Sequence, residues 1–314
     1  ALAVVATGED ILRDQGLLPG AVLARVAASH IRVGTFQYFA ARGDLTNLQA
    51  LIRHTLARHY PQAEPTALGL FDAVSKAQAR LIAQWMGVGF VHGVMNTDNI
   101  ALSGETIDYG PCAFLDNYRP DQVFSSIDRQ GRYAYDNQPR IMMWNLARLA
   151  EALLPFFDAD EARAVEIAND CLDKLAGHYH REWLFFMGQK IGVADEGLIN
   201  GFLGAIEGAD FTRCFAALSV GENALLDLVT DQTALRAWLP AWQALRNPHL
   251  TLNNPVVIPR NHLVEAALNA ATAGDMTPFH ALLTEVRQPY HPDRGEFAFG
   301  PPKDQAQYRT YCGT

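Results

Sequence analysis

Lysine is scarce in this chain of 314 residues, and none precedes position 76. The four lysines stand at positions 76, 174, 190 and 303, so arginine supplies most of the positive charge. Lys and Arg together number 25 against 34 Asp and Glu, which gives a net charge of -9 and a pI near 5.5. Nucleic acid and anionic membranes both require clustered basic side chains. The sequence therefore predicts neither nucleic acid nor a membrane as a partner.

Long apolar runs and closely spaced cysteines are also missing. No stretch approaches the roughly 20 apolar residues of a transmembrane helix, and the start, ALAVVATGED, lacks the basic region of a signal peptide. We therefore expect a cytoplasmic protein, or a mitochondrial matrix protein if the source is eukaryotic. The cysteines, at positions 112, 171, 214 and 312, show no C-x-x-C spacing, which disfavours a zinc site.

The residues that are abundant predict a large folded core and many helices. With 49% hydrophobic and 19% charged residues, the chain can bury a sizeable apolar interior. Residues 1–6 are typical of a strand, whereas residues 21–28 fit a strand or a helix. We expect the tail, residues 289–314, to be largely irregular. Apolar residues at helical spacing predict helices over 48–56, capped by Thr46, and over 71–85, 139–153, 159–176, 179–191, 197–206, 210–219, 231–247 and 261–272.

The stretch HGVMNTDNIALSGETIDYG, residues 92–110, has the pattern of a kinase catalytic centre with one position changed. A kinase loop, H-R-D-L-x-x-x-N, supplies a catalytic Asp and a metal-binding Asn, and a later D-F-G supplies a second metal ligand. Here Asn99 and the Asp108 of D-Y-G have the expected spacing, but Val94 replaces the catalytic Asp. The pattern indicates either an inactive kinase or a catalyst of a different transfer, with a hairpin of ordinary turns as the alternative.

Oxygen ligands in this pattern suit magnesium. Mg²⁺ prefers one or two carboxylates together with waters and substrate phosphates. Asn99 and Asp108 are separated by SGET, which can turn the chain back and bring both onto one ion. Asp98 adds a second carboxylate beside Asn99. The motif therefore predicts a nucleotide site with a metal ion.

Arg25 and Arg32 are candidates for binding phosphate in the absence of lysine. A guanidinium group can bind two phosphate oxygens at once through a bidentate pair of hydrogen bonds. Because they are seven residues apart, the two side chains share a face only if the segment is helical or folded back. On the pattern alone, surface arginines explain them better.

Longer stretches resemble the selenoprotein O family of pseudokinase-like protein adenylyltransferases. The resemblance implies an α+β, protein-kinase-like fold, with a remnant of the small lobe and hinge in residues 1–40. Residues 41–314 would form a mostly helical large lobe with the catalytic loop, activation segment and tail. The stretches are AVLARVAASHIRVGTFQYFAARGD, HGVMNTDNIALSGETIDYGPCAFLD, DRQGRYAYDNQP followed by WNLARLAEAL, and the closing YCGT.

The resemblance also implies a reaction. ATP would bind in a flipped orientation, so that AMP passes to a Ser, Thr or Tyr hydroxyl of a protein and pyrophosphate leaves. The family's roles would make Asp98 the base, Asn99 and Asp108 the ligands of Mg²⁺ or Mn²⁺, and Arg25 and Arg32 the pair that holds the γ-phosphate of ATP.

Redox regulation is a further implication of the resemblance. Family members are redox-linked and carry a reactive Cys or selenocysteine near the C-terminus. A reversible disulfide between Cys112 and Cys312 would follow, although spacing alone favours two unrelated thiols.

One departure from the family concerns the start of the chain. The family's glycine-rich segment, phosphate-binding Lys and its Glu partner would precede Ala1, in agreement with the lack of lysine before position 76. We therefore expect an N-terminally truncated member that is inactive as it stands. A catalytically dead nucleotide-binding or scaffolding pseudokinase and an ordinary phosphotransferase are the alternatives, and Val94 argues against the second.

Overall fold

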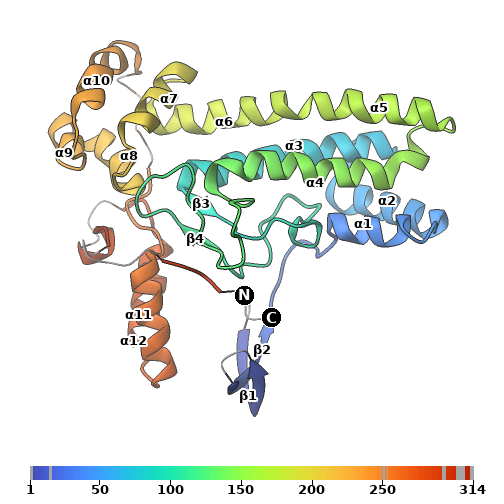
Figure 1. Ribbon diagram of the computed structural model, residues 1–314, viewed down its shortest axis with the longest axis horizontal. Helices are drawn as coiled ribbons and strands as arrows, with labels where there is room; N and C mark the ends of the chain where they lie inside the picture. Colours follow the sequence, from blue (N-terminus) through green and yellow to red (C-terminus); the bar gives the residue numbers. More distant parts are fainter. Residues whose placement is uncertain are drawn as a thin grey trace.

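The computed structural model describes residues 3–13, 16–247, 249, 252, 254–291, 295–301 and 308–311. It combines a long hairpin near the N-terminus with a body of helices and two very short strands (Figure 1). The mixed α+β class predicted from the sequence is confirmed. Within the described ranges, no helix has the length and apolar character needed to cross a membrane.

The hairpin extends away from the helical body (Figure 1). Its strands, β1 (Ala3–Arg13) and β2 (Gly16–Ala24), pair in antiparallel register, which shifts between Ala6 and Asp10. Side chains on both faces of this ribbon are exposed; that of Leu12 is 79% exposed. A two-stranded ribbon has no core of its own, so its position depends on the segment that follows it.

The helical body is built almost as the sequence predicts. Each predicted helix is present with ends that differ by a few residues, and the segment 21–28 is strand only up to Ala24. The helices are α1 (Val33–Ala40), α2 (Leu45–His59), α3 (Ala67–Val88), α4 (Gln138–Leu153), α5 (Glu161–Asp173), α6 (Leu175–Ile191), α7 (Glu196–Ala205), α8 (Phe211–Val220), α9 (Glu222–Leu226), α10 (Thr233–Leu245), α11 (Asn261–Thr272) and α12 (Thr277–Val286), with 3-10 turns η1 (Thr97–Asn99), η2 (Tyr135–Asn137), η3 (Leu154–Phe156) and η4 (Gly295–Ala298).

Helix α3 is the central support of the body. It packs along α6 and α4, and α1 packs against α4 and α2 (Figure 1). Thr66 caps its start by accepting a hydrogen bond from Gly69 N, and Gly89, with φ of +71°, ends it in the left-handed conformation. The chain then enters strand β3 (Phe90–Val91), which pairs with β4 (Ala113–Phe114). Residues 92–110, the stretch with the kinase-like pattern, therefore lie in the connection between these two short strands.

Some local predictions are wrong. Asp44, and not Thr46, caps α2 by accepting a hydrogen bond from Asn47 N. Helices α1, α9 and α12 were not predicted, and α1 begins with Val33 and Gly34, which have low helix propensity. Packing of its buried Phe36 against the body compensates for that propensity.

Candidate active site

His92 ties the start of the kinase-like motif to the residues just before D-Y-G. Its backbone N–H donates to Gln138 Oε1 at 3.0 Å, its Nε2 lies 2.9 Å from the Ile107 carbonyl oxygen, and its Nδ1 accepts from Val94 N at 3.4 Å. The side chain is fully buried. Burial lowers the pKa of His92, against a smaller opposite effect of the Ile107 carbonyl and Asp108. These contacts assign the neutral ring with its proton on Nε2, a structural role.

Glycine is required directly after His92. Gly93 has φ of +83°, and a Cβ there would lie 2.6 Å from the Pro111 carbonyl oxygen. Only glycine adopts this conformation at such a close approach without cost. The loop therefore passes closely over the segment that follows D-Y-G.

The SGET turn brings the two halves of the motif together, as predicted. Gly104 has φ of +73°, and Ile100 pairs with Thr106 in an isolated antiparallel bridge. Asn99 and Asp108 flank this bridge on its open side, and both line one cavity. The turn therefore brings Asn99 and Asp108 to the same cavity although nine positions separate them in the sequence.

Asp108 is held by the two candidate arginines. Arg25 Nη1 bonds to its Oδ1, and Arg32 Nη2 lies 2.8 Å from its Oδ2. Partial burial acts to raise the pKa of Asp108, but the hydrogen bonds and charges of Arg32 and Arg25 outweigh it, and the pKa is lowered overall. Its φ is +56°, a conformation in which Asp and Asn are enriched among residues other than glycine.

The arginines reach one carboxylate because the irregular segment between them bends at Ala28 and is held by hydrogen bonds on both sides of that residue. Its Ala28 N–H donates to Glu105 Oε2 at 3.0 Å, and Arg58 Nε donates to the Ala28 carbonyl at 2.9 Å. Near its end, Arg32 pairs with Ala101 in an antiparallel bridge. The segment is not helical, and the bend at Ala28 brings the two side chains to one carboxylate.

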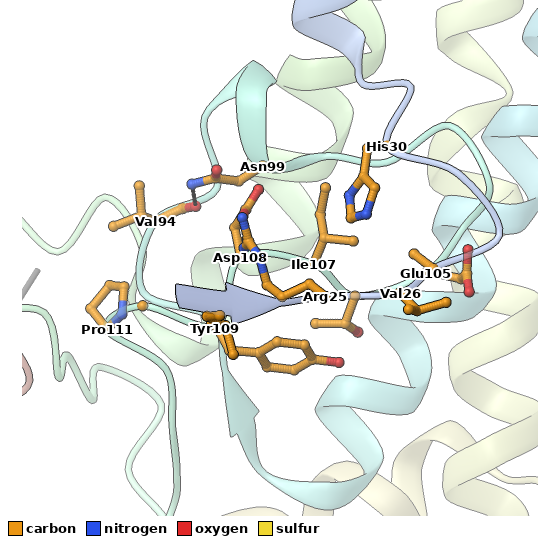
Figure 2. A pocket seen from close by; sticks show the side chains of 14 residues that line it. Arg25, Val26, His30, Val94, Asn99, Glu105, Ile107, Asp108, Tyr109 and Pro111 are labelled. Carbon is orange, nitrogen blue, oxygen red and sulfur yellow. Dashed lines mark hydrogen bonds and ion pairs between the residues drawn. The ribbon is translucent and has the colours of Figure 1, made fainter. Parts of the chain in front are cut away.

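The candidate residues lie around a cavity of about 830 Å³ (Figure 2). Arg25, Asn99 and Asp108 line it from three separate segments, and Val94 lines it at the position of the kinase base. Arg32 is not part of its lining and reaches it through Asp108. The volume is within the range of small-molecule sites.

Asp98 lies outside this lining. It is exposed, and its carboxylate rests against Gly34 at the start of α1, where an added Cβ would collide with Asp98 Oδ1. The five candidate residues are thus divided: Arg25, Arg32 and Asp108 form one ion-paired group, Asn99 lines the same cavity, and Asp98 is exposed and outside the lining.

The donor atoms fit a metal ion shared with a substrate. Asn99 Nδ2 donates to the Val94 carbonyl at 2.8 Å, which leaves its Oδ1 available as a ligand. Both oxygens of Asp108 are engaged by arginine, so one of them must be released for an ion. Across the described residues, no group of three or more His, Cys, Asp or Glu side chains could hold a metal without help. An ion that takes its other ligands from phosphates and water suits this set.

Comparison with known proteins identifies the family. A family model described as protein adenylyltransferase SelO matches residues 1–287. The chain belongs to the SelO family of protein adenylyltransferases. The protein nucleotidyltransferase YdiU of Cereibacter sphaeroides (strain KD131) is 51% identical, over all of this chain and 69% of the relative. The proteins of the same name from Mycobacterium sp. (strain KMS) and Methylorubrum populi are 50% and 46% identical, over all of this chain and 69% and 70% of those proteins. The resemblance inferred from the sequence is confirmed, and the enzyme class is nucleotidyltransferase.

In this SelO-family chain, Thr310 lies against the segment that follows D-Y-G. Thr310 Oγ1 donates to the Pro111 carbonyl at 2.7 Å, and Thr310 pairs in parallel with Ser125. Cys112 is half-buried next to this contact, and burial raises its pKa to about 11. Cys312, the other cysteine of the predicted disulfide, lies outside the described residues.

Two residues of the site were missed from the sequence. Glu105 lines the cavity and accepts from Ala28 N and Ser103 Oγ, so it anchors the arginine-bearing segment. His30 also lines the cavity. The sequence does show a carboxylate inside the SGET turn. Its hydrogen-bond partner, the backbone N–H of Ala28, is 77 residues away, so no local pattern could indicate the contact.

Proposed function

We propose that this SelO-family protein transfers AMP from ATP to Ser, Thr or Tyr hydroxyls of proteins, with Mg²⁺ as its metal and Mn²⁺ as the alternative. The observation that carries the proposal is the convergence of Arg25, Asn99 and Asp108 on one cavity in which Val94 replaces the kinase base. Without a carboxylate at that position, γ-phosphoryl transfer of the kinase type lacks its proton acceptor.

The arginines would exchange partners when the nucleotide binds. Arg25 and Arg32 neutralise Asp108 and are 44% and 27% exposed, so both guanidinium groups are accessible to phosphate oxygens. Two phosphate oxygens can accept the same bidentate hydrogen bonds from a guanidinium group as a carboxylate does. Asn99 and Asp108 would hold the ion, which would neutralise phosphate charge as it develops.

Asp98 would receive the proton of the acceptor. The acceptor oxygen bonds to the α-phosphorus, the bond to pyrophosphate breaks, and the hydroxyl proton passes to the Asp98 carboxylate. Its exposure beside the cavity supports this role, because a hydroxyl of another protein has to approach from solvent.

A kinase-like arrangement is part of the proposal. The hairpin and residues 25–32 would be the small-lobe remnant and hinge, and the helical body would be the large lobe. Helix α1 packs against α4 and would therefore belong to the large lobe. The boundary between the lobes would then lie just before Val33, within residues 1–40, which the sequence predicts to be the small-lobe remnant and hinge.

A reversible disulfide is the regulatory part of the proposal. The contact between Thr310 and Pro111 supports a bridge from Cys112 to Cys312, two residues beyond Thr310, that would hold the tail against the activation segment.

The test is to supply ATP labelled at the α-phosphate or at the γ-phosphate to the full-length protein with a mixture of acceptor proteins. Adenylyl transfer predicts protein-bound label from the α-phosphate only. Label from the γ-phosphate only would establish an ordinary phosphotransferase, and label from neither would establish a nucleotide-binding pseudokinase.

A further inference from the structure

A second cavity, of about 660 Å³, lies between the C-terminal ends of α3 and α6. Thr106 lines both this cavity and the active-site cavity. Trp85, in its wall, donates a hydrogen bond from Nε1 to Thr106 Oγ1 at 2.8 Å. The volume again suits a small organic molecule.

Lys190 is the one lysine or arginine among the described residues that line this cavity. From the last turn of α6, its Nζ lies 2.9 Å from Asn254 Oδ1 and 4.2 Å from the centre of the Phe215 ring. Asn254 is buried, and its Nδ2 donates to the carbonyls of Lys190 and Phe215. Because both amide hydrogens are committed, the amide oxygen is fixed toward the amine. None of the described carboxylates pairs with this amine.

Such a lysine is costly for a purely structural role. An ammonium group has three donors, and only one of them is used by Asn254. Burial lowers the pKa of Lys190 to about 7, because the surroundings solvate the charged amine poorly. A cation with free donors at a cavity wall is typical of a binding site.

The remaining wall suits a flat apolar group. Trp85 is held in position by its bond to Thr106. The exposed side chains of Gln84 and Gln189 add amide groups to the lining. The apolar lining residues are Leu81, Trp85, Val88, Phe186, Pro255 and Tyr290.

We propose that this second cavity binds a small organic anion, a carboxylate or phosphate monoester on a flat aromatic body, with Lys190 as its counter-ion. The aromatic body would pack against Trp85 and Phe186, and the anion would take the donors that Asn254 leaves free. The proposal does not depend on the adenylyl transfer reaction.

The experiment is a calorimetric titration of the full-length protein with phenyl phosphate and with benzoate. Lys190→Met removes the charge, and Lys174→Met is its control, because Lys174 is exposed. Gly87→Leu fills the cavity but keeps the amine, because a Cβ there would meet only Lys190 Cδ, at 3.8 Å. A melting curve of each variant establishes that it is folded.

We expect saturable binding of at least one probe to the wild type and to Lys174→Met. Its Kd should rise by roughly tenfold or more in Lys190→Met and in Gly87→Leu, since a charge-assisted contact and the space for the ring are lost. Absence of saturable binding would overturn the proposal. So would unchanged binding in Lys190→Met, which would place the probes elsewhere, or unchanged binding in folded Gly87→Leu, which would exclude the cavity.

Discussion

At the scale of single residues, Asp108 has a different environment from the one that its motif suggests. The pattern presents it as a metal ligand, whereas the structure pairs it with Arg25 and Arg32. The carboxylate of Asp108 neutralises the two guanidinium groups in the described structure. Phosphate oxygens could replace the carboxylate at the arginines, and a metal ion could replace the arginines at the carboxylate. The arginines and the aspartate therefore form one ion-paired unit.

Replacing Asp108 by Asn tests this unit. Asn tolerates the left-handed conformation of Asp108, so the backbone should be retained. We expect adenylyl transfer to fall by roughly 100-fold or more, and the free energy of unfolding to fall by about 1 kcal/mol or less, because these ion pairs are partly exposed. Labelled-ATP assays and denaturant unfolding measure the two effects. Asp72→Asn, which breaks an exposed pair with Lys76, is the control.

The pH dependence of Asp108→Asn has a definite sign. Since the pKa of Asp108 is lowered below its ordinary value of 3.8, its stabilising contribution is present above that value and is lost as the pH falls through the folded-state pKa. The stabilities of wild type and variant should therefore converge in strong acid. A difference that persists there would show that charge is not its cause.

Lys190 predicts a pH dependence of the same sign in a higher pH window, but for a group that destabilises the fold when charged. Its pKa is about 7 in the folded protein and 10.5 as an ordinary lysine, so the unfolded chain binds more protons between these values. Stability should rise with pH across this window, as the buried amine loses its charge. Lys190→Met should be more stable than the wild type at pH 7, by about 1 kcal/mol or more, and less dependent on pH from 7 to 10. Unfolding of wild type, Lys190→Met and the control Lys174→Met at several pH values checks this; a less stable Lys190→Met would contradict it.

At the scale of elements, helices with continuous apolar periodicity were predictable and short or weakly formed ones were not. Helix α3 has a Thr cap and a terminal Gly, so the sequence indicates both of its ends. Helix α1 starts at Arg32 with Val33 and Gly34, and forms because tertiary packing overrides propensity. Its start is also where Asp98 rests, which explains why a glycine is tolerated there.

Gly34→Ala should therefore affect catalysis more than folding. An added Cβ collides only with the flexible end of Asp98, while alanine favours the helix by about 0.5 to 1 kcal/mol. We expect a lower kcat with unchanged ATP binding and little change in the melting temperature, because the proposed base is displaced. Gly204→Ala is the matched control, since a Cβ in that part of α7 meets nothing within 4 Å. Normal turnover in folded Gly34→Ala would argue against Asp98 as the base.

At the scale of the whole molecule, the site depends on contacts that the sequence could not specify. Arg25 and Arg32 are 83 and 76 residues from Asp108, and no local pattern predicts which carboxylate they meet. The family resemblance supplied the identities of the candidate residues, whereas their geometry depends on the bent segment that joins the arginines. The tail adds a longer connection, because Thr310 meets Pro111 across 199 residues.

This connection leads to the last prediction, that mild peroxide links Cys112 to Cys312 and lowers the transfer rate. Peroxide oxidises one thiol to a sulfenic acid, and the other thiol displaces water to form the disulfide, which closes a loop of about 200 residues. With Cys112 as the attacking thiol and a pKa of about 11, bridge formation should accelerate by about tenfold per unit between pH 7 and 9. Mass spectrometry of non-reduced digests detects the bridge, and dithiothreitol should restore the rate. Cys112→Ser should abolish both effects, whereas Cys171→Ser, in α5, should keep them. If both cysteines are alkylated freely after oxidation, or if dithiothreitol leaves the rate unchanged, the tail does not regulate the site through this bridge.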